Sequence, residues 1–161
     1  MRKNLFALAA ATLLAGAAHA ATPNEYAIDP GHTFVTFEIN HFGASVNRAR
    51  FDKKQGTVQF DKAGKTGKVE ISFDANSVNT GTPAFDKHLQ GADLFNVEQF
   101  PTMKFVSDKF TFDGDKVTQV AGQLTLLGKT APVTFKANQF NCYDSPMLKR
   151  EVCGGDFEAT I

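Results

Sequence analysis

Asp86 and His88 lie two positions apart in the segment DKHLQGADLFNVEQFP, residues 86–101, and an acid beside a histidine is a pairing used in general acid–base catalysis. Thr82 and Pro83, just before this segment, predict the start of a short helix with the threonine hydroxyl as its N-cap. Helical positions two apart point about 200° away from each other, so the two side chains cannot form a dyad. We therefore expect His88 to be exposed or to cap the helix.

The rest of the chain offers little further catalytic chemistry. His32 and His41 lie on separate predicted segments, and chance placement explains them better than a composite metal site. Residues 43–47 begin like the turn that carries a nucleophilic serine, but the second glycine and the strand-to-helix context of that turn are missing. The sequence therefore predicts no catalytic residue, no metal and no cofactor.

The N-terminus has the pattern of an export signal. Two basic residues precede an apolar run at residues 5–18, and Ala18 and Ala20 occupy the −3 and −1 positions of a cleavage site. The run is shorter than the ~20 residues that span a bilayer. We expect a signal peptide over residues 1–20 and one soluble, secreted, periplasmic domain over residues 21–161.

Composition limits the partners and the redox state. Without Arg2 and Lys3 of the signal, the 17 basic and 17 acidic residues become 15 and 17, scattered along the chain, which disfavours nucleic acid as a partner. The only two cysteines, Cys142 and Cys153, lack the C-x-x-C spacing of a redox or metal pair. In an exported chain we expect them to form a disulfide, which stabilises by roughly 3 kcal/mol in the loop-entropy model.

Alternation of apolar and polar residues predicts strands along most of the chain. In KVEISFD, residues 68–74, Val69, Ile71 and Phe73 face one side and polar residues face the other. Similar runs lie at residues 33–42, 57–61, 102–106, 116–126, 131–139 and 155–161, with turn residues between them. Short strands without long helices predict an all-β antiparallel barrel of about eight strands, and a Phe-filled sandwich is the alternative.

The segment at residues 86–101 has an apolar side that suits a lid. Phe85 and Leu89 share one helix face, and Leu94 and Phe95 follow in an apolar stretch that Pro101 ends. We expect this helical segment to cover one open mouth of the barrel.

Five stretches in order resemble a known family: YAIDPGHTFVTFEINHFG, FDKKQGTVQFD, NSVNTG, DKHLQGADLFNVEQFPTMKFVS and GQLTLLGKTAPVTF. They are similar to the successive motifs of the YceI-like family of exported polyisoprenoid-binding proteins. The resemblance implies a lipocalin-like barrel, an apolar channel for a long isoprenoid chain and no known catalytic residues. Ala49 stands where the family usually has glycine, and the alternation still running at Ile161 predicts that the barrel lacks the family's last hairpin in this sequence.

The leading hypothesis is a carrier or sequestering protein for an isoprenoid lipid or isoprenoid quinone. Transient membrane contact and a homodimer are further expectations. His41 continues the inward series of its strand, where it would meet a head group or bond to backbone. The residues predicted to line the channel are Val35, Phe37, Ile39, His41, Val58, Phe60, Val69, Ile71, Phe73, Leu89, Leu94, Phe95, Phe105, Leu124, Leu126, Val133 and Phe135.

Two other classes of function remain as alternatives. An exported hydrolase or isomerase acting on an apolar substrate would use His41 as its base, and it needs a carboxylate or nucleophile within hydrogen-bond reach of that ring. A structural secreted domain would have a filled core without a continuous apolar cavity.

Overall fold

The computed structural model describes residues 23–161, so the predicted signal peptide at residues 1–20 lies outside the described residues. The strands are β1 (Asn24–Ala27), β2 (Val35–His41), β3 (Ser45–Phe51), β4 (Lys54–Asp61), β5 (Thr66–Asp74), β6 (Val78–Asn79), β7 (Thr102–Asp113), β8 (Lys116–Leu126), β9 (Lys129–Ser145) and β10 (Arg150–Glu158). A 3-10 turn (Ala75–Ser77) precedes β6, and helix α1 (Pro83–Leu89) precedes β7. None of the helices in this range has the length and apolar character needed to cross a membrane.

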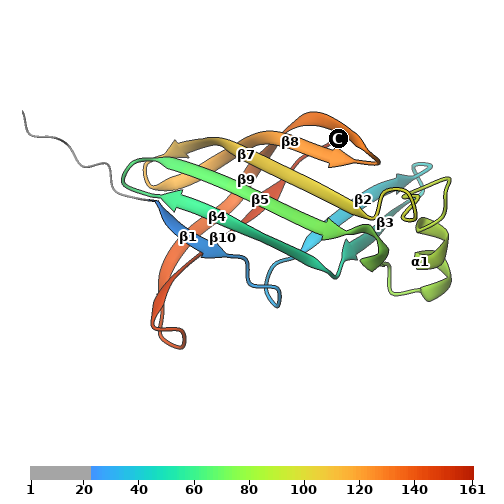
Figure 1. Cartoon of the computed structure of the whole chain (residues 1–161), viewed down its shortest axis with the longest axis horizontal. Coiled ribbons are helices and arrows are strands. Elements are labelled where there is room, and N and C mark those ends of the chain that lie inside the picture. The colour runs from blue at the N-terminus through green and yellow to red at the C-terminus, as the bar shows by residue number, and fades with distance from the viewer. Residues whose placement is uncertain (1–22) are drawn as a thin grey trace, which may run out of the picture.

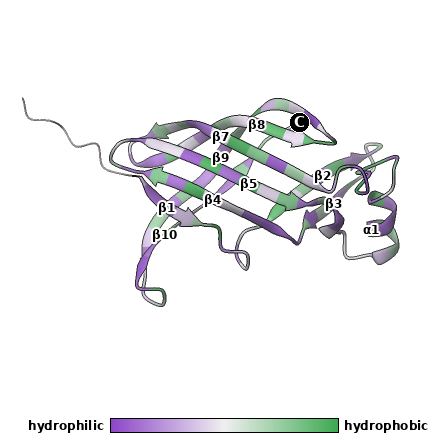
Figure 2. Cartoon of the chain, viewed as in Figure 1, coloured by the Kyte–Doolittle hydropathy of each residue, from purple (hydrophilic) through white to green (hydrophobic). Residues whose placement is uncertain are grey.

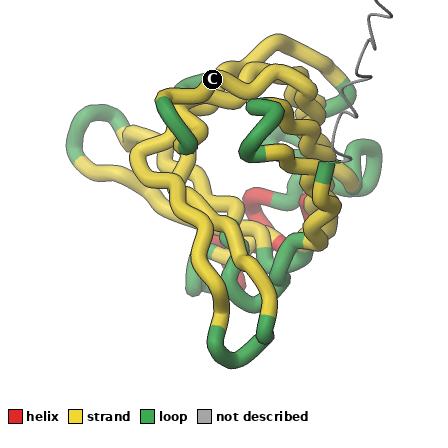
Figure 3. Tube along the Cα trace, turned by 90° about the vertical axis from the view of Figure 1, so that its left-hand side faces the viewer, coloured by secondary structure: helices red, strands yellow, loops and turns green. Residues whose placement is uncertain are grey.

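Seven strands form one antiparallel sheet in the order β1-β4-β5-β7-β8-β9-β10. The sheet curls round on itself into a half-barrel, as the view along it shows (Figure 3). A smaller sheet of β2, β3 and β6 lies beside α1 at one end (Figure 1). The predicted all-β, antiparallel, curled architecture is therefore confirmed, although β1 and β10 remain the two edges of the large sheet rather than partners in a closed ring.

Bulges and a glycine allow the sheet to bend. The pairing of β7 with β8 shifts between Val106 and Lys109 and again between Thr111 and Phe112, and such bulges increase twist and curvature. On β8, a Cβ atom at Gly122 would collide with the backbone carbonyl of Val106 and lie 2.7 Å from the ring of Phe105, so the close approach of β7 and β8 beside the bulge requires glycine there.

Several strand boundaries differ from the sequence prediction. β7 runs on to Asp113 instead of ending near residue 106, because the bulge interrupts the alternation that marks the strand. β9 is longer at both ends than predicted, and β10 covers Arg150–Glu158 rather than residues 155–161. β3 was not predicted at all: Phe42 and Gly43 take positive φ angles of 54° and 76° and form the turn of the β2–β3 hairpin.

The predicted lid is present at one end of the half-barrel. Leu89 is buried and Phe85 is partly buried, both on the helix face predicted to be apolar. The helix starts as predicted, with Thr82 as the N-cap and Pro83 as its first residue, but the Thr82 side chain makes no capping hydrogen bond. Instead the Asp86 carboxylate accepts hydrogen bonds from the backbone N–H and the hydroxyl of Thr80, each 2.6 Å long, which fastens the helix to the loop before it.

Candidate functional site

Apolar and polar residues alternate along the curled strands (Figure 2), and the apolar side chains gather in two clusters. The first, which we call the lid cluster, lies under α1. Its buried members are Ala49, Phe51, Phe73, Ala75, Val78, Leu89, Val97 and Met103, and Val35, Phe37, Ile71, Phe85, Phe95 and Leu126 pack against them. Phe51 is its centre, with ring centroids 5.5 Å from Phe37, 5.1 Å from Phe73 and 5.5 Å from Phe95. This end of the interior is closed.

The second cluster, which we call the open cluster, occupies the rest of the interior. Its buried members are Phe60, Val69, Phe105, Val117 and Val120, and the partly buried ones are Tyr26, Val58, Ile71, Phe110, Phe112, Leu124, Phe135, Phe140, Cys142, Cys153 and Phe157. Most of these inward-facing side chains keep some exposed surface, in contrast to the lid cluster. Ile71 packs against both clusters and links their apolar surfaces.

Most of the predicted channel residues reach this interior. In the lid cluster lie Val35, Phe37, Phe73, Leu89, Phe95 and Leu126; in the open cluster lie Val58, Phe60, Val69, Phe105, Leu124 and Phe135; Ile71 belongs to both. Direct contact of these residues with a ligand stays a prediction.

Four predicted channel residues lie outside both clusters. Ile39 and Leu94 are 54% and 39% exposed, and His41 is exposed at the end of β2. These three side chains therefore lie outside the packed interior, and their contact with a ligand stays a prediction. Val133 is partly buried.

The interior also contains residues that the sequence pattern did not single out. Phe110 and Phe112 lie beyond the β7 bulge, which moves them onto the inner face. Phe60 lies 5.5 Å from Phe140 between ring centroids, and Phe140 lies 6.4 Å from Phe157. If the alternation on β7 is continued past the bulge with one residue inserted, it places Phe110 and Phe112 on the inner face.

A side-chain hydrogen bond joins the two edge strands of the large sheet. The Tyr26 hydroxyl of β1 donates a 2.6 Å hydrogen bond to the Glu151 carboxylate of β10. This hydrogen bond, with burial and the negative charge of Glu151, raises the pKa of Tyr26 above its ordinary value. Tyr26 packs against the open cluster, so the contact lies at the seam of the half-barrel beside the apolar interior.

The three histidines of the described residues show no catalytic arrangement. His32 lies 2.7 Å from Asp29, both well exposed, and this hydrogen bond lowers the pKa of Asp29. His88 is exposed beside the ring of Phe85, as expected, while Asp86 bonds to Thr80. The His41 backbone carbonyl accepts a 3.0 Å hydrogen bond from Ala44, but among residues 23–161 no side-chain hydrogen bond or ion pair reaches its ring, so the structure shows no partner of the kind that the hydrolase or isomerase hypothesis requires.

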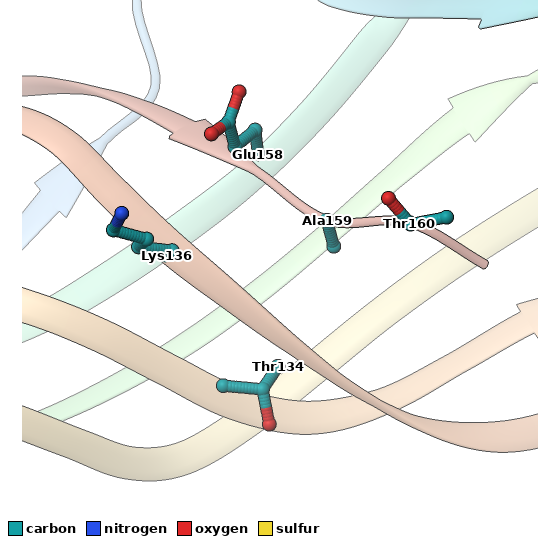
Figure 4. Close-up of a pocket in the computed structure, with 5 residues that line it drawn as sticks. All are labelled: Thr134, Lys136, Glu158, Ala159 and Thr160. Atoms are coloured by element: carbon teal, nitrogen blue, oxygen red, sulfur yellow. The ribbon is translucent and has the colours of Figure 1, made fainter.

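Two shallow hollows lie on the outer face of the sheet. The larger, about 560 Å³, is lined by Lys68, Val69, Glu70, Val106, Ser107, Asp108, Lys109, Ala121, Gly122, Gln123, Pro132, Val133 and Thr134. The other, about 320 Å³, is lined by Thr134, Lys136, Glu158, Ala159 and Thr160 (Figure 4). Lys68, Glu70, Gln123 and Thr134 alternate with the inward residues, which places both hollows outside the barrel. The apolar interior is therefore the better candidate site.

The predicted disulfide is present between Cys142 and Cys153, which face each other across β9 and β10 with Sγ atoms 2.04 Å apart. Glu151 lies near both sulfur atoms. Because the sulfurs are bonded to each other, this group offers no thiolate to a metal.

Removing the disulfide is expected to lower the free energy of unfolding by about 3 kcal/mol, because the unfolded chain regains the entropy of a short loop. The double variant Cys142→Ala, Cys153→Ala and the unaltered protein under reductant should give the same shift in urea unfolding. Two reactive thiols in the unfolded, unreduced protein would contradict the pairing.

Comparison with known proteins agrees with this architecture. The model of the YceI-like domain matches residues 26–161. The chain is 39% identical over 151 residues to Protein YceI of Salmonella arizonae, across 91% of this chain and 77% of that relative. The crystal structure of Burkholderia cenocepacia BcnA is similar with a TM-score of 0.60 and 25% identity, over 70% of this chain and 72% of that one. The YceI protein of Campylobacter jejuni shares the fold, with a TM-score of 0.56 and 22% identity over 85% of this chain and 97% of that one. The protein therefore belongs to the YceI-like family.

Proposed function

We propose that this protein binds a long isoprenoid chain, of the polyprenyl or quinone type, in the apolar interior of its half-barrel, and carries or sequesters it in the periplasm. The observation that carries the proposal is the open cluster: a set of inward-facing aromatic and aliphatic side chains that keep exposed surface and connect through Ile71 to the closed lid end. The family resemblance of the sequence motifs supports the same ligand class, and the export pattern of residues 1–20 supports the location.

The chemistry of this interior suits a hydrocarbon chain. Phe60, Phe140 and Phe157 form a row of ring contacts, and Phe105 lies 4.9 Å from Phe135 edge to face. Contact between a hydrocarbon chain and aromatic or aliphatic side chains makes the binding free energy more favourable in proportion to the apolar area removed from water. A long, branched, unsaturated chain supplies such area without requiring polar partners along its length.

A matched pair of variants on β8 tests the proposal. Leu124 faces the open cluster, whereas Gln123 beside it is exposed on the outer face. Leu124→Asp places an unpaired carboxylate against the ligand and should weaken binding of a long-chain polyprenol to the delipidated protein by about tenfold or more. Gln123→Asp should leave binding unchanged. Both are measured by fluorescence competition, with circular dichroism to confirm the fold.

Equal binding by the two correctly folded variants would reject the interior as the binding site. Absence of polyprenol binding by the unaltered protein would reject the proposed function.

A further inference from the structure

The hairpin that joins β9 and β10 projects from the half-barrel with an apolar tip. We call residues 142–153 the arm; it is the orange-to-red hairpin at the lower left of Figure 1. Met147 is 87% exposed at its turn, Leu148 is 55% exposed beside it, and Tyr143 on β9 is 54% exposed. Three large apolar or amphipathic side chains are thus held in solvent on one narrow projection.

Positive charge lies next to this apolar tip. Lys149 and Arg150 follow Leu148 directly, and both are exposed. The two acidic residues of the arm, Asp144 and Glu151, lie farther from the tip, opposite each other across β9 and β10. Glu151 accepts the hydrogen bond from Tyr26 at the seam. Apolar side chains at the tip with cations just behind them match the order of layers in a bilayer that contains anionic lipids. Tyrosine is likewise favoured at the boundary between lipid and water.

The size of the tip argues for a lipid surface over a protein partner. Three side chains of at most about 150–250 Å² each, two of them only 54% and 55% exposed, offer less than the roughly 600–1,000 Å² that each partner buries in a stable protein interface. A bilayer needs no complementary pocket and admits such a tip to a depth of ~5–10 Å.

The base of the arm is fixed to the candidate site. The Cys142–Cys153 disulfide joins its two strands, and both cysteine side chains pack against the open cluster. The Tyr26–Glu151 contact holds the adjacent seam. A docked arm would therefore bring the open cluster close to the lipid surface.

We infer that the arm docks the protein onto a bilayer containing anionic lipid, by inserting Met147 and Leu148 while Lys149 and Arg150 meet lipid phosphates. The inference rests on the proposed function in one respect: it names the surface from which the apolar interior takes its ligand, or to which it delivers it.

A tryptophan reporter tests the insertion directly, because the chain contains no Trp. Met147→Trp should shift its emission to shorter wavelength when phosphatidylethanolamine–phosphatidylglycerol vesicles are added. Phe42→Trp, at the 95% exposed tip of the β2–β3 hairpin, is the matched control and should not shift. No shift for Met147→Trp, or an equal shift for both, would overturn the inference.

Charge variants test the mode of docking. Met147→Asp combined with Leu148→Asp should lower co-sedimentation with these vesicles by about tenfold or more. Lys149→Gln and Arg150→Gln should each weaken binding by about fivefold and, together, remove the preference over phosphatidylcholine vesicles. Unchanged co-sedimentation of these variants would contradict the inference. A dimer in vesicle-free solution that Met147→Asp dissociates would also contradict it, by assigning the tip to a second copy.

The two proposals fail separately. The Met147→Asp, Leu148→Asp protein should still bind a dispersed polyprenol as the unaltered protein does, while losing its uptake from vesicles. Loss of polyprenol binding in that variant would overturn the separation of arm and interior. Docking by a protein that binds no polyprenol would reject the proposed function and leave the arm as a membrane anchor.

Discussion

Affinity for isoprenoids is expected to rise steeply with each five-carbon unit until the interior is full, and then to level off. At about 0.8 kcal/mol per buried CH₂, one unit contributes up to roughly 3 to 4 kcal/mol. Association itself costs of the order of 4–15 kcal/mol, so short isoprenoids should bind weakly and longer ones strongly. The closed lid end, packed around Phe51, gives the interior a finite length and hence the plateau.

The measurement is a titration of the delipidated protein with a series of isoprenoid alcohols of increasing length. Saturated linear alcohols of equal carbon number are the control, since they separate a general preference for hydrocarbon from a preference for the branched chain. Affinity that does not depend on length would contradict a channel and return a filled core to contention.

Phe51→Ala is expected to lower the free energy of unfolding by about 3–5 kcal/mol, the range for deleting a buried aromatic side chain. Phe51 is only 4% exposed and contacts three other phenylalanine rings, from β2, β5 and the segment after α1. Its loss would leave a cavity at the place where the small sheet, the large sheet and the lid meet. The change should appear as a lower urea midpoint in circular dichroism.

Phe42→Ala on the same hairpin is the control, because Phe42 is 95% exposed and surface substitutions usually change stability by less than about 0.5 kcal/mol. Phe51→Leu should lie between the two, since it keeps most of the apolar volume. If Phe51→Ala and Phe42→Ala were equally stable, the packing around Phe51 would not be what holds the small sheet, the large sheet and the lid together.

The parts of the fold that local alternation reveals were predictable. β5 and residues 120–126 of β8 show one apolar and one polar face, because one side of each segment packs inward and the other meets water. The helix face of Phe85 and Leu89 was predictable for the same reason at helical spacing.

The parts that depend on distant neighbours were not predictable. On β3 the side that packs inward includes Asn47 as well as Ala49 and Phe51, so its pattern is weak. On β2 the alternation correctly places Ile39 on the same side as Phe37. Phe37 packs against the lid cluster, whereas Ile39 is 54% exposed, and nothing in the sequence shows that the packing ends between these two residues. Alternation identifies a face; what lies against that face depends on the curvature of the whole sheet.

The seam between β1 and β10 also has a consequence for the order of folding. Most strand pairs join neighbours along the chain and can zip as hairpins, whereas Tyr26 and Glu151 are separated by 125 residues. Contacts between remote residues form slowly, because the entropy of closing a long loop must be overcome first. Rolling up the sheet and bringing its two edges together is therefore the late step, and until then the aromatic interior faces the surroundings in which the chain folds.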